Sequence, residues 1–115
     1  MPGVPSTGKP IPDEQPPLYF AVFHQPGPNW AEGVPFGDQD GVEVHVAYMK
    51  EQLREGNLVL GGPFLDNSGG MMILRAASLE AARAIVARDP AVVRRLLQVT
   101  VKPWLLVMDA LSPAT

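Results

Sequence analysis

The stretch Asn57–Ala77, NLVLGGPFLDNSGGMMILRAA, decides the fold of this chain. It holds two apolar runs, Asn57–Phe64 and Met71–Ala77, separated by the polar, glycine-rich segment Asp66–Gly70. Short apolar runs on either side of such a turn signal are typical of two strands in a β-hairpin. The centre of the chain is therefore expected to be a hairpin, and its flanks decide how the sheet is completed.

A helix is predicted on each side of this hairpin. Gly41–Glu55 carries apolar residues at a 4-3-4 spacing, with Asp40 expected as the N-terminal cap and Gly56 as the terminator. Ser78–Arg88 is the second helix, capped by Ser78 and with an inner stripe of Leu79, Ala82, Ile85 and Val86.

The outer segments supply the remaining elements. Leu18–His24 (LYFAVFH) predicts the first strand and Gln98–Met108 the last, and Asp89-Pro90 predicts the start of a short helix that runs to about Leu97. The order β-α-β-β-α-β indicates an α+β, ferredoxin-like fold: a four-stranded antiparallel sheet with both helices on one face.

The two outer strands are apolar on both faces. Leu18, Phe20 and Val22 alternate with Tyr19, Ala21 and Phe23, and the last strand follows the same pattern. Two helices cover only one face of a sheet, so something else must cover the second. A second copy of the chain is the simplest cover, and we expect a homodimer with sheets packed face to face.

Length and composition indicate one globular domain preceded by a leader that is much richer in proline. The chain has 115 residues, no cysteine and 13 prolines, six of which lie in residues 1–17. We expect a disordered, Pro-rich leader over residues 1–17, a globular domain over residues 18–109 and a short tail over residues 110–115. Without cysteine, disulfides, thiolate metal sites and a cysteine nucleophile are excluded.

Charge and hydropathy exclude several classes of partner. The net charge is −3 and the basic residues are scattered, so nucleic acid is not expected as a partner. No apolar run approaches the roughly 18 residues of a membrane span, and the first residues contain no signal-peptide core. A cytoplasmic protein that contacts no membrane is expected.

Strand directions gather the polar residues at one rim of the sheet. In the predicted topology the first strand and the hairpin turn reach the same edge, where both helices also have one end. That edge should hold His24, Trp30, His45, Gly61, Gly62, Asp66 and Asp89.

His45 is the strongest candidate for chemistry at this rim. It borders the apolar stripe of the first helix, and a free histidine titrates near pH ~6.5. A carboxylate at hydrogen-bond distance would fix its tautomer and raise its basicity. Asp66 and Asp89 are both candidates, although Asp66 could serve only the turn and Asp89 only the cap before Pro90.

Five further residues are candidates for substrate binding: Trp30, Gly61, Gly62, Pro63 and His24. The glycines could allow a ligand to approach the backbone closely, or they could simply form a bend. Trp30 could line a pocket, or it could pack the loop Pro26–Asp40 onto the domain. The two histidines lie 21 positions apart, without a metal-binding spacing. Neither a metal nor a cofactor is expected.

Five motifs in order resemble the YciI-like (YCII-related domain) family. They are His45–Gly56 (HVAYMKEQLREG), Leu58–Pro63 (LVLGGP), the helix start SLEAA at Ser78, Asp89-Pro90, and Val101–Trp104 (VKPW). The similarity covers about residues 18–108.

The resemblance implies a ferredoxin-like fold paired into a dimeric α+β barrel, with an acid–base site built round a histidine and an aspartate. The family's histidine carries over onto His45. Its aspartate carries over onto Asp66, with Asp89 as the second choice. At least one relative is associated with removing HCl from a chlorinated hydroxyquinol.

Three functions are open at this point. The first is a small cofactor-independent enzyme in which His45, oriented by an aspartate, moves a proton on a small aromatic or carbonyl substrate in a lyase or isomerase step. The second is a non-catalytic dimer that binds a small ligand or acts as an accessory protein. The third, by fold analogy alone, is a cofactor-free monooxygenase.

Overall fold

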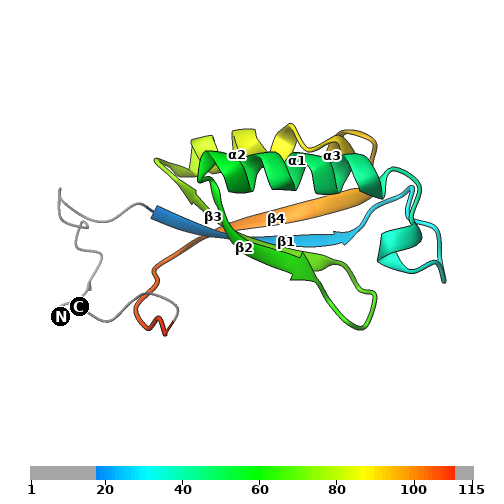
Figure 1. The fold of residues 1–115 in the computed structure, drawn as a ribbon, viewed down its shortest axis with the longest axis horizontal. Coiled ribbons are helices and arrows are strands. Elements are labelled where there is room, and N and C mark those ends of the chain that lie inside the picture. The colour runs from blue at the N-terminus through cyan, green and yellow to red at the C-terminus, as the bar shows by residue number, and fades with distance from the viewer. Residues whose placement is uncertain (1–17, 111–115) are drawn as a thin grey trace.

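The strands and helices follow one another in the predicted order (Figure 1). The computed structural model describes residues 18–110, so the predicted leader and, apart from Ala110, the predicted tail lie outside the described residues. The elements are β1 (Leu18–Pro26), the 3₁₀ turn η2 (Phe36–Asp38), α1 (Val42–Glu55), β2 (Leu58–Pro63), β3 (Gly70–Ala76), α2 (Leu79–Ala87), α3 (Pro90–Val93) and β4 (Leu97–Trp104).

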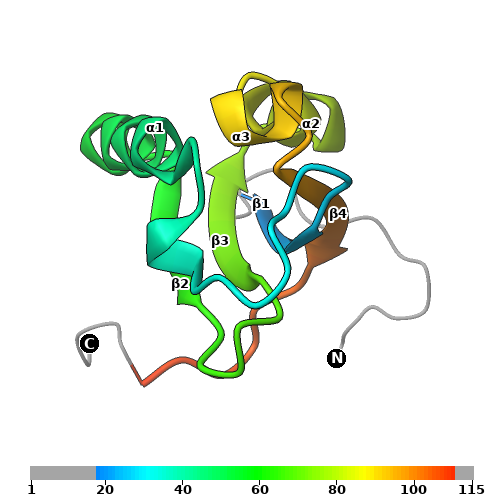
Figure 2. The same cartoon turned by 90° about the vertical axis from the view of Figure 1, so that its right-hand side faces the viewer.

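The strands form one antiparallel sheet in the order β2-β3-β1-β4. The three helices lie together on one face of this sheet, as Figure 2 shows from the end of the molecule. This is the ferredoxin-like α+β arrangement that the hairpin and its flanking helices predict. No helix within residues 18–110 is long and apolar enough to span a bilayer.

Two boundaries near the C-terminus differ from the prediction. The last strand ends at Trp104 instead of Met108, because its partner β1 begins at Leu18 and the ladder closes at the pair Tyr19 and Trp104. The short helix α3 ends at Val93, well before Leu97, since Arg95 takes a left-handed conformation with φ of 62° that breaks the helix.

The prediction that Asp40 caps α1 is wrong. Gly41 occupies the cap position with φ of 93°, so Asp40 lies one residue too early and no side chain caps the helix. The other caps are confirmed: Ser78 accepts a hydrogen bond from the Ala81 amide, and Gly56 ends α1 in the left-handed conformation.

The main core lies between the sheet and the helices. Alternate residues of β1 and β3 point to this side, where they pack against the predicted inner stripe of α2. Its buried members are Phe20, Val22, Met72, Leu74, Ala82 and Val86. A second cluster around Ala91, Leu96 and Leu97 joins α3 to β4 and supports the loop after β1.

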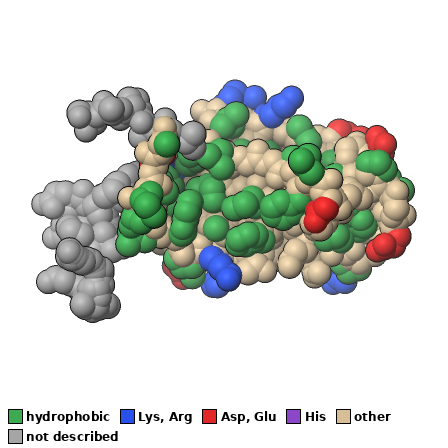
Figure 3. Space-filling view, turned by 90° about the horizontal axis from the view of Figure 1, so that it is seen from below, with side chains coloured by type: hydrophobic (Ala, Val, Ile, Leu, Met, Phe, Trp, Pro, Cys, Tyr) green, Lys and Arg blue, Asp and Glu red, His purple; other side chains and the backbone are tan. Residues whose placement is uncertain are grey.

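The opposite face of the sheet is also rich in apolar side chains. Figure 3 views the molecule from this side, where hydrophobic residues form a band across the sheet. By register, Tyr19, Ile73 and Trp104 belong to this face, and Trp104 is 45% exposed. The prediction of two apolar faces is confirmed for β1 but only in part for the last strand: β4 places Thr100 and Lys102 beside Trp104 on this face, and Leu106 and Met108 lie beyond its end.

The hairpin turn requires glycine where it approaches β1. Gly69 has φ of 125°, and a Cβ placed there would lie 1.9 Å from the carbonyl oxygen of His24. We expect Gly69→Ala to lower the free energy of unfolding by at least about 2–3 kcal/mol, because backbone strain and backbone displacement add. Gly37→Ala is the control, since its added Cβ would meet nothing within 4 Å. Equal urea midpoints for the two variants would contradict this account.

Candidate active site

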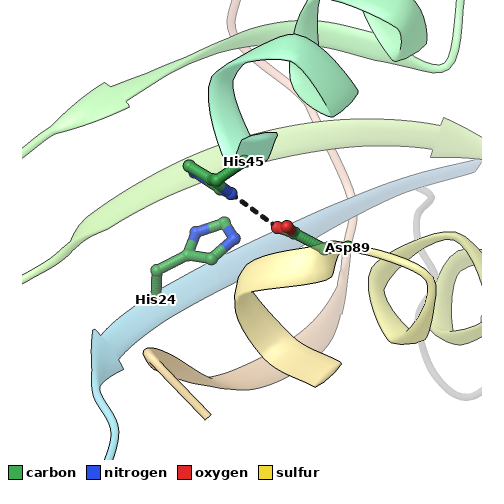
Figure 4. Close-up of side chains that lie close together, drawn as sticks. All are labelled: His24, His45 and Asp89. Carbon is green, nitrogen blue, oxygen red and sulfur yellow. Dashed lines mark hydrogen bonds and ion pairs between the residues drawn. The ribbon is translucent and has the colours of Figure 1, made fainter. Parts of the chain in front are cut away.

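Three elements bring His24, His45 and Asp89 together (Figure 4). His24 lies near the end of β1, His45 lies in the first turn of α1, and Asp89 is the N-terminal cap of α3. All three are buried in residues 18–110, and Asp89 is 0% exposed. Residues far apart in sequence thus form one cluster at the predicted rim.

The closest contact of the cluster is a hydrogen bond of 2.6 Å between His45 Nδ1 and Asp89 Oδ2. The other carboxylate oxygen, Oδ1, accepts the Ala91 amide at 2.9 Å, which is the helix cap. An ionised carboxylate only accepts hydrogen bonds, so it fixes the His45 tautomer with its proton on Nδ1. The other nitrogen, Nε2, is then left for whatever occupies the adjoining pocket.

His24 is the unpartnered member of the cluster. Its ring meets the His45 ring edge-on, with centroids 5.3 Å apart, and its buried Nε2 has no hydrogen-bond partner within residues 18–110. The pKa of His24 is lowered from 6.5 to about 4: burial is the main cause and His45 adds to it, while the Asp89 charge acts in the opposite direction. His24 is therefore a neutral imidazole at pH 7 with unused hydrogen-bonding capacity.

A pocket of about 270 Å³ adjoins the two histidines. Its walls come from α1, β2, β3 and the turn η2, and they are almost wholly apolar; they include Phe36, Val42, Val46, Met49, Leu53, Leu58 and Met72. The predicted stripe of α1 thus faces this pocket more than the core, and Val46 and Leu53 remain substantially exposed. Small-molecule sites have this composition: apolar walls and a few convergent polar groups.

The sequence reasoning missed two residues that shape the site. Phe36 stacks on His45 with ring centroids 6.0 Å apart. Asn67 of the hairpin turn holds Phe36 in place, because its Oδ1 accepts the Phe36 amide at 2.8 Å while its Nδ2 donates to the Val34 carbonyl. The signal available in the sequence was an asparagine inside a turn, a residue type that forms such backbone bonds.

Asp66 does not reach His45, so the first choice of partner is wrong. Its carboxylate accepts bonds from the Ser68 amide and hydroxyl within the exposed turn, and these bonds hold the pKa of Asp66 below its usual value. Asp66 therefore has the turn-stabilising role, and Asp89 is the hydrogen-bond partner of His45.

The remaining candidates divide between the pocket and its supports. Gly61, Gly62 and Pro63 line the pocket, and a Cβ on Gly61 would lie 2.7 Å from that of Met72. Trp30 does not line it: the indole packs edge-on against Phe36, at 5.5 Å, on the second core cluster. Trp30 therefore supports the residue that stacks on His45.

The cluster also contains the ligand types of a metal site. One ligand atom from each of His24, His45 and Asp89 lies within 4.8 Å of the others, a proximity that their sequence spacing does not reveal. Two ligands of one tetrahedral ion lie about 3.3 Å apart, given metal–ligand distances near 2.0–2.1 Å. His45 and Asp89 are closer than this, at hydrogen-bond distance. The geometry is thus that of a hydrogen-bonded pair, and the absence of a metal stays a prediction.

Fold and cluster together define a class: a ferredoxin-like α+β protein with a buried His–Asp pair beside an apolar pocket. The chain belongs to the YCII-related domain family, whose model matches residues 19–105. That match confirms the resemblance drawn from the five sequence motifs.

Two relatives are informative. The uncharacterized protein YjpA of Bacillus subtilis (strain 168) is 35% identical over 67 residues, which are 58% of this chain and 79% of that protein. The structure of 5-chloro-2-hydroxyhydroquinone dehydrochlorinase (TftG) from Burkholderia phenoliruptrix AC1100, in complex with 2,5-dihydroxybenzoquinone, is 22% identical with a TM-score of 0.60. The match covers 76% of this chain and 93% of the dehydrochlorinase chain, and it shows that the two share a fold.

The neutral state of His24 makes stability depend on pH. The unfolded chain takes up a proton at His24 near pH 6.5 but the folded chain only near pH 4, so unfolding becomes easier as pH falls through this window. The loss is on the order of 3 kcal/mol for this shift. Urea denaturation at pH 7 and pH 4.5 should therefore show a smaller loss in His24→Phe than in the wild type. Equal losses would contradict a neutral His24.

Proposed function

We propose that this protein is a cofactor-independent enzyme that moves a proton on a small aromatic or carbonyl substrate. The observation that carries the proposal is the 2.6 Å bond between His45 Nδ1 and Asp89 Oδ2 at the pocket wall. A histidine held this way presents Nε2 as the base and returns the proton from the same atom. Asp89 is the positioning residue of the pair.

The chemistry that fits is elimination or isomerisation. His45 Nε2 removes a proton from a carbon next to a carbonyl, and the electron pair of the C–H bond forms a C=C bond as the carbonyl oxygen gains charge. The electrons then either expel a leaving group or recapture a proton at another carbon. Both outcomes balance without a second reactant, and the apolar walls keep water from the charged intermediate.

The structural neighbour is consistent with this class of reaction. The dehydrochlorinase shares the fold and acts, as its name states, by removing HCl from a hydroxylated aromatic compound. The pocket here has the volume and apolar walls for a ring of that size. Elimination on an aromatic ring is therefore one of the two outcomes that we propose.

We also propose that the protein acts as a homodimer whose sheets pack face to face. The apolar band on the face opposite the helices supports this, since monomers rarely expose a large apolar patch (Figure 3). Trp104 lies on this face at the edge strand β4. Beyond it, Leu105, Val107 and Met108 are exposed as well. A second copy would cover this surface and complete a dimeric α+β barrel.

The acid–base proposal is tested by hydrogen exchange at carbon. Small ketones, oxo acids and hydroxylated aromatics are incubated with the protein in D₂O, and the loss of C–H signals is followed by NMR. His45→Ala should slow exchange by about 10²–10⁴-fold, the usual contribution of a general base. If compounds bind but exchange equally with wild type and His45→Ala, the protein is a binding module and not an enzyme.

Asp89→Asn separates the catalytic contact from the helix cap. The amide oxygen can keep the Ala91 bond, which leaves the amide nitrogen facing His45 Nδ1. His45 must then carry its proton on Nε2, so it cannot act as the base. We expect a loss of exchange close to that of His45→Ala with little change in the urea midpoint. Exchange at the wild-type rate in folded Asp89→Asn would contradict the role of the pair.

The dimer is tested by sedimentation of the full chain at micromolar concentration. We expect twice the chain mass of 12.4 kDa for the wild type and a shift toward the monomer for Trp104→Glu. Val93→Glu is the matched control, because Val93 is an exposed apolar residue of α3 on the helical side. A monomeric wild type, or equal effects of the two variants, would refute the interface.

A further inference from the structure

The pocket is polar at two places and apolar between them. His24 and His45 form one end, and the only charged side chain among the described residues that line the pocket is Lys50. We propose that the pocket binds a small aromatic acid, with its carboxylate at Lys50 and a hydroxyl or carbonyl oxygen at His24 and His45. The inference names the substrate class for the proposed function and uses the same site.

Lys50 is the cation that would recognise the acid. It is exposed, and within the described part of the chain it forms no ion pair, whereas the nearby Arg54 is paired with Glu51. The chain as a whole carries a net charge of −3, so an anion is attracted only where a cation stands apart from the acidic residues. Apolar walls beside Lys50 strengthen that attraction, because they exclude water from one side of the ion pair.

The spacing on α1 sets the length of the ligand. Lys50 follows His45 by five residues, which is about 7.5 Å along the helix axis and about 140° around it, so the two residues lie at opposite edges of the helix face that lines the pocket. One aromatic ring with substituents at opposite positions spans a distance of this order. Between the two ends, Val46 and Met49 of α1 supply an apolar wall for the ring.

His24 supplies the second anchor. Its buried Nε2 has no hydrogen-bond partner within residues 18–110, and the residue is only 4% exposed. Buried polar groups in native proteins are nearly always satisfied, so an unpartnered imidazole on a pocket wall indicates a ligand atom. The neutral state of His24 suits an uncharged oxygen at this end and leaves the anion to Lys50.

The test uses three ligands that differ in one group each. 4-Hydroxybenzoate has both anchors, 4-hydroxybenzamide lacks the charge and benzoate lacks the hydroxyl. The chain has two histidines, so their ring signals in NMR report binding at the pocket directly. We expect 4-hydroxybenzoate to bind about three- to tenfold more tightly than either analogue at low salt, the range of one partly exposed ion pair or one hydrogen bond.

Variants assign each preference to its residue. Lys50→Met should abolish the preference for the acid over the amide, whereas Lys102→Met, at an exposed lysine of β4 outside the pocket, should keep it. His24→Phe should abolish the preference for the hydroxyl and leave that for the acid. If His24→Phe does not fold, His24→Gln, which restores a polar group, should retain part of the hydroxyl preference.

Each outcome decides the inference independently of the enzyme proposal. Equal binding of acid and amide to the wild type, an acid preference that survives Lys50→Met, or no binding of any of the three ligands would overturn it. A hydroxyl preference unchanged in both His24 variants would overturn the assigned orientation. Binding is measured without turnover, so failure of the exchange test leaves this result intact, and the reverse also holds.

Discussion

The carboxylate of Asp89 is the constraint on which the site depends. It is completely buried, and a buried charge is tolerated only when hydrogen bonds replace the water that it loses. Its two oxygens bind different elements. Oδ1 accepts a hydrogen bond from the Ala91 amide in the first turn of α3, and Oδ2 is hydrogen-bonded to His45 of α1. One side chain therefore fixes the start of α3, the tautomer of His45 and the contact between α1 and α3.

This double use explains why sequence alone assigned the wrong aspartate first. Asp89 before Pro90 has the pattern of an ordinary helix cap, and that interpretation is confirmed. A cap engages one carboxylate oxygen, however, and the other remains available for a residue 44 positions earlier in the chain. The family resemblance makes Asp66 the first choice, but the carboxylate of Asp66 accepts its hydrogen bonds from Ser68. A local sequence pattern predicts the bond that a carboxylate makes with its neighbours in the chain. It does not predict the bond that the second oxygen makes with a distant residue.

The fold was more predictable than the site for a physical reason. Element order, strand pairing and the Ser78 and Gly56 caps follow from periodicity and local bonds, which neighbouring residues determine. The site depends on contacts between distant segments. Phe36, which stacks on His45, is held by its amide bond to Asn67, 31 residues later, and no local pattern predicts that contact. The end of β4 at Trp104 is similarly set by where its partner strand begins.

The stripe on α1 shows the limit of periodicity most clearly. Residues at this spacing are expected to fill a core, yet Val46 and Leu53 stay 43% and 55% exposed because they line the pocket. A core wall and a pocket wall need the same apolar side chains, so their sequence patterns are identical. The two kinds of wall differ in what lies opposite them: Gly61 of β2, paired with Met72 on the helical face of the sheet, has no side chain to fill the space against α1. The protein thus leaves part of its apolar surface unburied, beside the hydrogen-bonded pair of His45 and Asp89.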